Sequence, residues 1–503
     1  MTEVDVLIVG AGISGIGGAV HLKQKCPGKS FVILEGRERL GGTWDLFKYP
    51  GIRSDSDMYT LGFEFKPWTE SKAIADAPSI LNYLHETVDE FGLAPHIQFQ
   101  TRVIELNWSS DAQRWTITTE NGADKRRETI SAGFVFMGTG YYSYSEPYKP
   151  EFEGEAYFEG QVIHPQQWPE NLDYNGKKVV VIGSGATAVT LVPAMIEGGS
   201  GHVTMLQRSP GYIFSGPSED WLAIASNKYL PSKLAYALTR WRKIGMQLLS
   251  YTVAQKNPEK VKTALFKQAE TELGAEYPRL KKDLTPSYGP WDQRLCLIPD
   301  GDMFRVVREK QADIVTGHIA RFTPTGIELK DGRHLEADII ITATGLKMEI
   351  MSGVSLSVDN HAVKLCDTIS YRGFMYSDVP NLVSSFGYSN ASWTLKSDLI
   401  GNYMCRLIKH MDAGGYGSAT PHADTVTAQK ESLMNLSSGY VDRALATLPK
   451  QGNREPWRSH HNYFIDRWNL KRGAIDNDMV FTPRRSGSVP TAQPEQEFAE
   501  AAE

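Results

Sequence analysis

Residues 158–169, FEGQVIHPQQWP, lie between two glycine-rich loops, GAGISG at 10–15 and GSGATA at 183–188. Each loop follows a short apolar run and precedes a stretch that is typical of a helix, the arrangement of a strand–loop–helix unit that binds a dinucleotide. The sequence therefore predicts an α/β fold with two Rossmann-like dinucleotide-binding domains. The segment 158–169 would connect them, on a skeleton of Phe158, Gly160, His164, Trp168 and Pro169.

The first loop has glycines with separate tasks. Gly10 allows a tight turn, Gly12 lets the backbone approach a pyrophosphate, and Gly15 allows helix and strand to pack closely. The phosphates would lie at the N-terminus of the helix that begins near Ser14, where free N–H groups and the helix dipole favour anions. The next strand, FVILE, ends in Glu35, whose carboxylate can accept hydrogen bonds from ribose hydroxyls.

The second loop differs from the first in the strand that follows it. HVTMLQRSP ends in Gln207 and Arg208 instead of an acid. A carboxylate would repel a 2′-phosphate, whereas a guanidinium can bind it with two hydrogen bonds. This favours NADPH over NADH, the alternative being that Arg208 is only a surface charge. The predicted contacts of this loop are Gly183, Ser184, Gly185, Ala186, Thr187, Ala188 and Val189.

Composition excludes several other classes of protein. With 53 Lys and Arg against 59 Asp and Glu, the formal charge of −6 argues against nucleic acid as a partner. The four cysteines show no CxxC spacing, so we expect neither a metal site nor a dithiol redox centre, and a reduced cytoplasmic compartment fits best. We expect no signal peptide and no transmembrane segment, since no apolar run approaches roughly 18 residues.

The stretch 217–288 has a helical pattern. Residues 230–256 carry apolar side chains at helical spacing, and Pro258 is placed to start a second helix. The basic cluster of Arg240, Arg242 and Lys243 beside Trp241 is interpreted as a solvated helix face, with weak peripheral contact to a membrane surface as the alternative.

Taken with RSDSD at 53–57 and YGPWDQRLCLIPDGDMF at 288–304, the connector resembles the fingerprint of type I Baeyer–Villiger monooxygenases. The resemblance covers residues 4–480 and is strongest to the subgroup that contains the mycobacterial ethionamide-activating monooxygenase. Related flavin monooxygenases acting on nitrogen and sulfur lack the Trp168–Pro169 ending.

The resemblance implies an FAD domain interrupted by an NADPH domain that carries a helical insertion. The expected boundaries are 1–145 and 336–483 for the FAD domain, 146–169 for the connector, 170–216 and 289–335 for the NADPH domain, 217–288 for the insertion, and 484–503 for a disordered tail.

The resemblance also implies which side chains serve each cofactor. Thr43, Trp44, Asp45, Leu46 and Asp55 would line the flavin. The run HIQFQTRVIEL at 96–106 is expected to be one strand, and its backbone at Val103 would bind the adenine. Arg53, Ser54 and Asp55 would also contact NADPH. Asn390 and Trp393 are weaker candidates near the flavin and substrate, and Asp57 is interpreted as a helix cap.

Arg294 would stand over the flavin, held by Asp55, and stabilise an anionic peroxide formed at the flavin C(4a). Gln293 replaces the lysine that many family members carry there. His164 would couple the two domains by hydrogen bonds, with Phe158 and Trp168 as packing anchors.

The function implied is conversion of ketones to esters or lactones with NADPH and dioxygen, and oxygenation of sulfides as a side activity. The alternatives are a flavin monooxygenase acting mainly on sulfur or nitrogen, and an NADPH-oxidising redox or electron-delivery flavoprotein. A disulfide reductase would need a cysteine pair near the flavin, which the sequence does not indicate.

Overall fold

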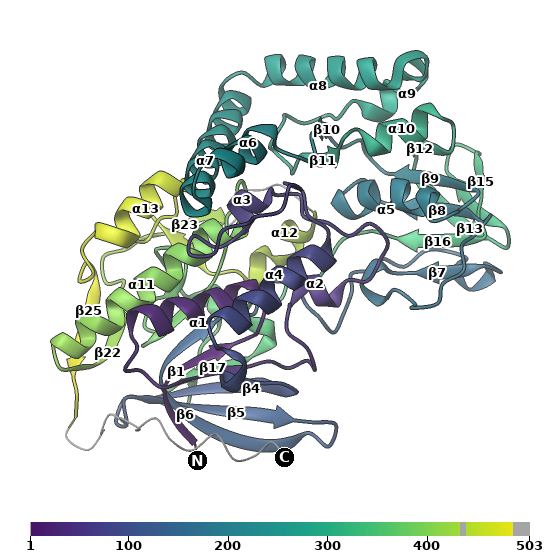
Figure 1. The fold of residues 1–503 in the computed structure, drawn as a ribbon. Coiled ribbons are helices and arrows are strands. Elements are labelled where there is room, and N and C mark those ends of the chain that lie inside the picture. The colour runs from purple at the N-terminus through teal and green to yellow at the C-terminus, as the bar shows by residue number, and fades with distance from the viewer. Residues whose placement is uncertain (1, 433–438, 486–503) are drawn as a thin grey trace, which may run out of the picture.

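The first of two domains is built on a nine-stranded sheet that is parallel in one part and mostly antiparallel in the other (Figure 1). β1 (Thr2–Val9) pairs in parallel with β2 (Phe31–Leu34) and β6 (Arg126–Met137), and β6 also pairs in parallel with β21 (Leu382–Ser384). The other strands are β3 (Ile97–Gln98), β4 (Thr101–Ser109), β5 (Arg114–Asn121), β17 (Ser355–Val358) and β18 (His361–Ala362). The computed structural model describes residues 2–432 and 439–485.

Three helices cover one face of this sheet: α1 (Ile13–Lys25), α4 (Ala77–Glu90) and α11 (Trp393–Ala413) (Figure 1). Because side chains of a strand alternate between faces, Val6 and Ile8 of β1 pack with these helices, whereas Leu7 and Val9 pack with Trp108 on the other side. The apolar run that starts the chain is thus a strand buried on both faces, as parallel strands usually are.

The second domain has a five-stranded, fully parallel sheet in the order β12–β9–β8–β16–β7. Its strands are β7 (Gln161–Ile163), β8 (Lys178–Ile182), β9 (His202–Gln207), β12 (Ala312–Thr316) and β16 (Ile339–Thr342). Helices α5 (Ala186–Glu197) and α10 (Asp302–Arg308) pack against it, and the antiparallel strands β13 (Ile319–Thr323), β14 (Gly326–Leu329) and β15 (His334–Glu336) lie beside it.

The position of β16 corrects one expected boundary. Because β16 pairs with β8 and β7, the chain stays in the second domain until Thr342, so the boundary at residue 336 was too early. Its apolar composition suits a central parallel strand of either sheet, and only the pairing assigns it.

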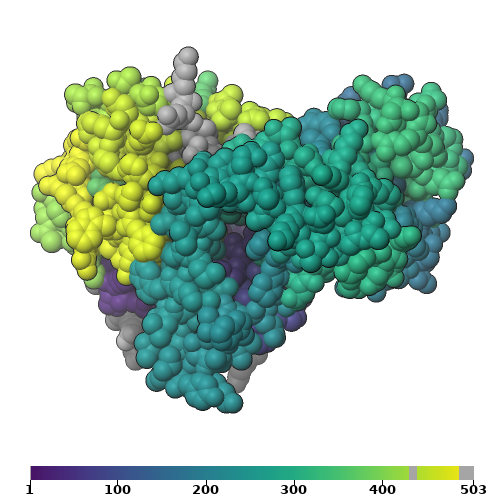
Figure 2. Space-filling model, turned by 90° about the horizontal axis from the view of Figure 1, so that it is seen from above, coloured from purple at the N-terminus to yellow at the C-terminus, as the bar shows by residue number. Residues whose placement is uncertain are grey.

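The helical insertion leaves the second domain after β10 (Ile213–Gly216) and returns at β11 (Cys296–Pro299), and these two strands pair in parallel. It consists of α6 (Trp221–Tyr229), α7 (Ser232–Lys256), α8 (Pro258–Leu273) and the short α9 (Tyr277–Leu280). The predicted helices of 230–256 and from Pro258 are therefore confirmed. Seen from above, insertion residues frame a hollow with N-terminal residues at its base (Figure 2).

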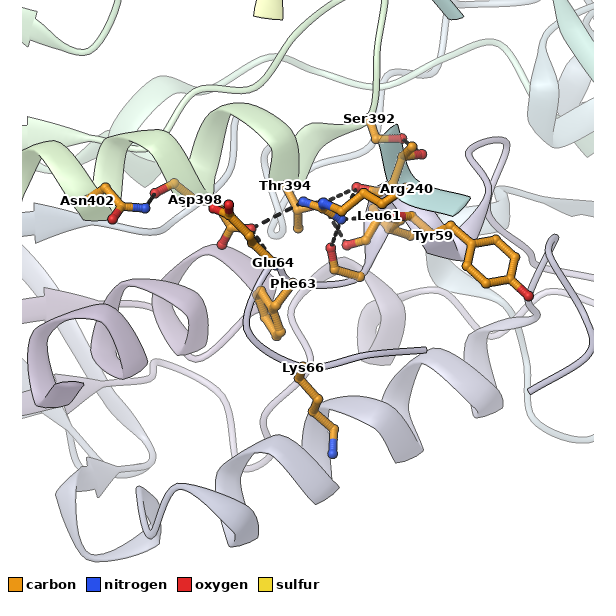
Figure 3. A network of polar contacts seen from close by, with 12 residues as sticks. Tyr59, Leu61, Phe63, Glu64, Lys66, Arg240, Ser392, Thr394, Asp398 and Asn402 are labelled. Carbon is orange, nitrogen blue, oxygen red and sulfur yellow. Dashed lines mark hydrogen bonds and ion pairs between the residues drawn. The ribbon is translucent and has the colours of Figure 1, made fainter. Parts of the chain in front are cut away.

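The interpretation of Arg240 as part of a solvated face was wrong. Its side chain is buried and donates to the carbonyl oxygens of Tyr59 at 2.9 Å and Gly62 at 2.6 Å, and it pairs with Asp398 at 3.4 Å (Figure 3). A buried cation needs such partners, so Arg240 ties α7 to the first domain. Arg242 and Lys243 are half-buried and both pair with Asp220.

A second correction concerns the run 96–106, which was expected to be one strand. It forms β3 and β4, separated at Phe99–Gln100, where Gln100 has a φ of +53°. That left-handed conformation breaks an extended strand.

The C-terminal part returns to the first domain. It contains β19 (Ser370–Tyr371), β20 (Met375–Tyr376), β22 (Tyr416–Pro421), β23 (Ala428–Ser432), α12 (Gly439–Ala444), β24 (Lys450–Gly452), α13 (Tyr463–Arg472) and β25 (Met479–Pro483). Of the expected tail 484–503, residues 486–503 lie outside the described residues. Within the described chain, no helix combines the length and apolar character needed to cross a bilayer.

Candidate functional site

A cleft of about 320 Å³ opens at the carboxyl ends of β1 and β2. Open α/β sheets bind their ligands at this edge. Five predicted FAD contacts lie on its wall: Gly10, Gly12, Glu35, Leu46 and Val103. The cleft is also lined by Arg37, Thr139, Tyr144 and Ser145, which were not among the predicted FAD contacts.

The first loop is packed so closely that its glycines are required. A Cβ at Gly15 would lie 1.8 Å from the carbonyl oxygen of Gly10, far inside contact distance. Ser14 is buried at the start of α1, and its hydroxyl accepts a hydrogen bond from the indole Nε1 of Trp393 at 2.7 Å. The weaker candidate Trp393 thus contacts the first loop, while Asn390 donates to the carbonyl of His461.

Glu35 follows β2 directly and points back at the loop. Its carboxylate accepts from the backbone N–H of Ala11 at 2.8 Å and of Arg37 at 2.9 Å. Burial raises its pKa, and these two hydrogen bonds partly offset the shift. The carboxylate is therefore oriented by the loop, and its remaining lone pairs can accept from ribose hydroxyls.

Asp45 lies in the short helix α2 (Thr43–Leu46), where three cations surround it. It pairs with Arg37 at 2.8 Å, Arg39 at 3.1 Å and Lys48 at 3.2 Å. Although burial alone would raise its pKa, hydrogen bonds from Arg39 and Lys48 hold it below its usual value. Thr43 bonds the hydroxyl of Tyr144 at 3.2 Å, and Trp44 packs against the core of the first domain.

The chain from Phe47 to Ile52 leaves the first domain and packs on the core of the second. Tyr49 is buried there, and burial raises its pKa to about 12 although Thr187 of the second loop hydrogen-bonds to it. The interpretation of Asp57 as a cap is confirmed, because its carboxylate accepts from the N–H of Thr60 at the start of α3 (Met58–Leu61).

Arg294 and Asp55 meet at the junction of the two domains. Nε of Arg294 lies 3.0 Å from Oδ2 of Asp55, and their side chains are 40% and 28% exposed, so a ligand can reach both. The carboxylate of Asp55 raises the pKa of Arg294 further, which keeps the guanidinium charged at every relevant pH. The neighbouring Trp291 packs edge-on against Tyr251 of α7, so the insertion supports this loop.

An aromatic group faces the arginine. The hydroxyls of Tyr141 and Tyr142 lie 2.8 Å apart, Tyr141 stacks on Trp393, and Tyr142 meets Tyr440 edge-on. Burial raises the pKa of Tyr141 and Tyr142, so both stay protonated near neutral pH. These phenols were missed by sequence reasoning. The YY pair after the GTG turn was an available signal, whereas Tyr440 had none.

The second loop leads into α5, and the N-terminus of this helix is not covered by other parts of the described chain. A Cβ at Gly185 would meet no protein atom within 4 Å, so room for a phosphate remains there. Arg208 is exposed, and the described residues offer it no hydrogen-bonding partner. Gln207 is buried and donates to the carbonyl of Asp283 and to Thr316, so its amide serves the fold.

Arg53 and Ser54 precede Asp55, and they differ in whether a polar group remains free to bind a ligand. Arg53 pairs through Nη1 with Asp302 at 2.6 Å, but its Nη2 is buried with no partner in the described chain. A buried guanidinium nitrogen without an acceptor is costly, which suits a ligand oxygen there. The hydroxyl of Ser54 donates to the carbonyl of Ser56 at 2.8 Å.

Two chain segments cross between the domains, and they run antiparallel to each other. Tyr142 and Met348 form an antiparallel bridge, the N–H of Ser143 donates to the carbonyl of Lys347 at 2.8 Å, and Thr344 donates to Tyr148 at 2.9 Å. These two segments, residues 142–148 and 344–348, therefore pair with each other between the domains, and we call them the strap.

The connector 158–169 lies against this strap. Nδ1 of the buried His164 accepts from the N–H of Gln166 at 3.1 Å, and Gln166 donates to the carbonyl of Ser143 at 2.9 Å. Burial lowers the pKa of His164, and the nearby backbone of Gly345 and Tyr148 offsets only part of this lowering. A neutral His164 thus contacts both crossovers.

The remaining fingerprint residues pack. Phe158 is buried against Phe322, and Trp168 packs on the core of the second domain. A Cβ at Gly160 would lie 2.2 Å from the carbonyl of Asp338, so only glycine fits. Pro169 is exposed. Across the described residues, no group of three or more His, Cys, Asp or Glu is placed to hold a metal ion.

Known proteins are similar in sequence to this chain along most of its length. The family model of pyridine nucleotide-disulphide oxidoreductases matches residues 7–263. The chain is 50% identical over 488 residues to the FAD-containing monooxygenase EthA of Mycolicibacterium smegmatis, covering 97% of this chain and 99% of that protein. It is 49% identical over 493 residues to the probable FAD-binding monooxygenase AlmA of an Acinetobacter species, covering 98% and 99%.

Among solved structures, an oxidised steroid monooxygenase bound to NADP has a TM-score of 0.76 at 21% identity, covering 96% of this chain and all of that one. The fold of the two domains and their crossovers is therefore shared with that enzyme. The chain belongs to the pyridine nucleotide-disulphide oxidoreductase family and, within it, to the FAD-containing monooxygenases related to EthA.

Proposed function

We propose that this chain is an FAD-dependent monooxygenase that uses NADPH and dioxygen to convert ketones to esters or lactones and that also oxygenates sulfides. The single observation that carries the proposal is the Arg294–Asp55 pair, a permanent cation held 3.0 Å from its carboxylate at the domain junction. A charge fixed in advance stabilises negative charge that develops on oxygen without reorganising during the reaction.

The residues present fit FAD in the first domain. The cleft runs past Gly10 and Gly12, and Glu35 is oriented for a ribose. When bound, FAD would accept a hydride from NADPH and activate dioxygen. The Ser14–Trp393 hydrogen bond and the Tyr141–Trp393 stack would hold the wall of the flavin pocket in place.

The residues of the second domain fit NADPH. The open N-terminus of α5 would take the pyrophosphate, and the exposed Arg208 would take the 2′-phosphate. The unpaired Nη2 of Arg53, close in sequence to Asp55, supports a further contact with NADPH. Since Gln207 is engaged in the fold, NADPH preference would depend on Arg208.

Within the chain, each residue then has a separate task. Asp55 occupies the Nε side of Arg294, which leaves the terminal nitrogens to donate to an anionic oxygen at the reacting centre. His164 would hold the strap so that the two nucleotide sites move together. The phenols of Tyr141 and Tyr142 would exclude water from the junction, which suppresses loss of the oxygenating equivalent.

The test measures product formed per NADPH consumed, with a ketone and a thioether of matched carbon skeleton. Wild type should couple most NADPH oxidation to conversion of the ketone into the ester. Arg294→Met should lower ester formation by roughly 100-fold or more, the usual effect of removing one preorganised charge stabiliser, while NADPH oxidation continues with release of hydrogen peroxide.

Arg305→Gln is the matched control, because Arg305 is also a partly exposed arginine paired with a carboxylate, Glu197, at 2.6 Å. It should leave coupling unchanged. Ester formation that survives Arg294→Met would remove the proposed role of the arginine. Oxygenation of the thioether alone would assign the chain to sulfur chemistry, and hydrogen peroxide as the sole product from wild type would indicate an oxidase or electron carrier.

A further inference from the structure

The helical insertion and α13 expose an unusual number of large apolar side chains. Trp221 and Tyr229 of α6 are 73% and 76% exposed, and Trp468 of α13 is 61% exposed. Other exposed apolar residues of these helices are Leu222, Ile224, Leu234, Leu238, Trp241, Met246, Leu249, Val253, Phe464 and Ile465. Single exposed apolar residues are normal, but a concentration on neighbouring helices marks an interaction surface.

The exposed residues of α7 and α13 form one surface. The ring of Trp241 lies 6.1 Å from that of Tyr463 and 6.0 Å from that of Phe464, measured between centroids. Arg467 covers the Trp241 ring at 4.9 Å. Figure 2 shows the insertion and the C-terminal residues side by side on the upper face. We call the exposed apolar residues of α6, α7 and α13 the apolar surface.

The charge of this region is opposite to that of the chain. Residues 221–257 contain six cations and no acid, in a chain of formal charge −6. The six are Lys228, Lys233, Arg240, Arg242, Lys243 and Lys256. Arg240 is buried, and Arg242 and Lys243 neutralise Asp220, whose pKa they lower to about 2 although burial opposes it. Lys228, Lys233 and Lys256 are exposed and have no ion pair in the described chain.

We propose that the apolar surface binds the surface of an anionic lipid bilayer. Helices that lie in the membrane interface are typically rich in tryptophan and tyrosine together with lysine and arginine. On α7, Leu234, Leu238, Trp241 and Leu249 are separated by four, three and eight residues, so they lie along one side of the helix.

The charge around the apolar surface argues against a second copy of the chain as the partner that covers it. A two-fold symmetric dimer through this surface would bring the unpaired lysines of both copies into one interface, where residues 221–257 offer no acid to pair with them, and like charges repel. Anionic headgroups would instead neutralise them, while the rings and aliphatic side chains enter the headgroup region.

The test uses the full-length holoenzyme and extruded vesicles of phosphatidylcholine, with and without phosphatidylglycerol, in a sedimentation assay. The protein should pellet with the anionic vesicles, and binding should weaken as salt increases. Lys228→Gln with Lys233→Gln should weaken it by roughly fivefold for each cation removed. Trp221→Ser with Tyr229→Ser should weaken it by about tenfold or more.

Tyr157→Ser is the matched control, because Tyr157 is 75% exposed but is flanked by Glu155 and Glu159 in the second domain. It should bind vesicles like wild type, and FAD content with circular dichroism checks that all variants are folded. Absence of pelleting, or pelleting that Tyr157→Ser reduces as much as the α6 changes, overturns the proposal. Dimerisation that the α6 changes abolish, without vesicle binding, would assign the surface to a second copy instead.

Discussion

Arg240 offers the sharpest test of how the insertion is held in place. Its guanidinium donates to the carbonyls of Tyr59, Thr60 and Gly62, and to the hydroxyl of Tyr236, and it pairs with Asp398 (Figure 3). Asp398 also contacts Nε2 of His21 at 3.1 Å and accepts from the N–H of Glu64 at 2.8 Å. The contact between α7 and the first domain is therefore a buried polar network.

Arg240→Leu would leave those acceptors buried without their donor. Breaking a buried charge pair by removing one partner costs about 3–5 kcal/mol. If α7 opens locally from the first domain, that loss raises the open population by roughly two to four orders of magnitude. Arg240→Lys keeps the charge but not the planar set of donors, so its effect should be intermediate.

The assay is native-state proteolysis with thermolysin, following cleavage within residues 221–256 by mass spectrometry. When opening and closing are fast, the cleavage rate reports the open population. Arg305→Leu is the control, since its ion pair is partly exposed and worth at most about 1 kcal/mol. Arg240→Leu with Asp398→Leu should be less destabilised than the sum of the two single variants. A cleavage rate for Arg240→Leu within about threefold of wild type would refute this account.

Three further predictions concern the nucleotide loops and the connector. Gly15→Ala should yield protein without FAD, seen as a lost ratio of visible to ultraviolet absorbance, because the added Cβ would lie 1.8 Å from a carbonyl oxygen; a variant that retains flavin would contradict the packing. Arg208→Gln should raise KM for NADPH by about 10–100-fold, the loss of a charged hydrogen bond, with KM for NADH unchanged; equal effects on both would argue against 2′-phosphate recognition. His164 has a lowered pKa, so the unfolded chain binds its proton first as pH falls below about 6.5. Stability should be fully present above that pH and decline below it, and His164→Gln should flatten this decline in urea unfolding measured from pH 7.5 to 5; an unchanged slope would mean that His164 does not contribute.

Local patterns were enough to predict several elements. The loops at 10–15 and 183–188, the helices of the insertion and the cap at Asp57 depend on residues close in sequence, so composition and spacing indicate them. The Arg294–Asp55 contact was anticipated from family resemblance rather than from spacing, since 239 positions separate the two residues and no local rule links them.

Other features depended on long-range packing. The sequence alone determined two dinucleotide loops, a helical insertion and a basic segment, because glycine geometry, helical periodicity and charge are properties of short stretches. Only the tertiary structure decided that β16 joins the second sheet, that Arg240 is buried while its neighbours face Asp220, and that Tyr440 approaches the Arg294 loop. In each case the outcome depends on a partner far away in sequence, and the burial and charge of that partner become defined only when the chain has folded.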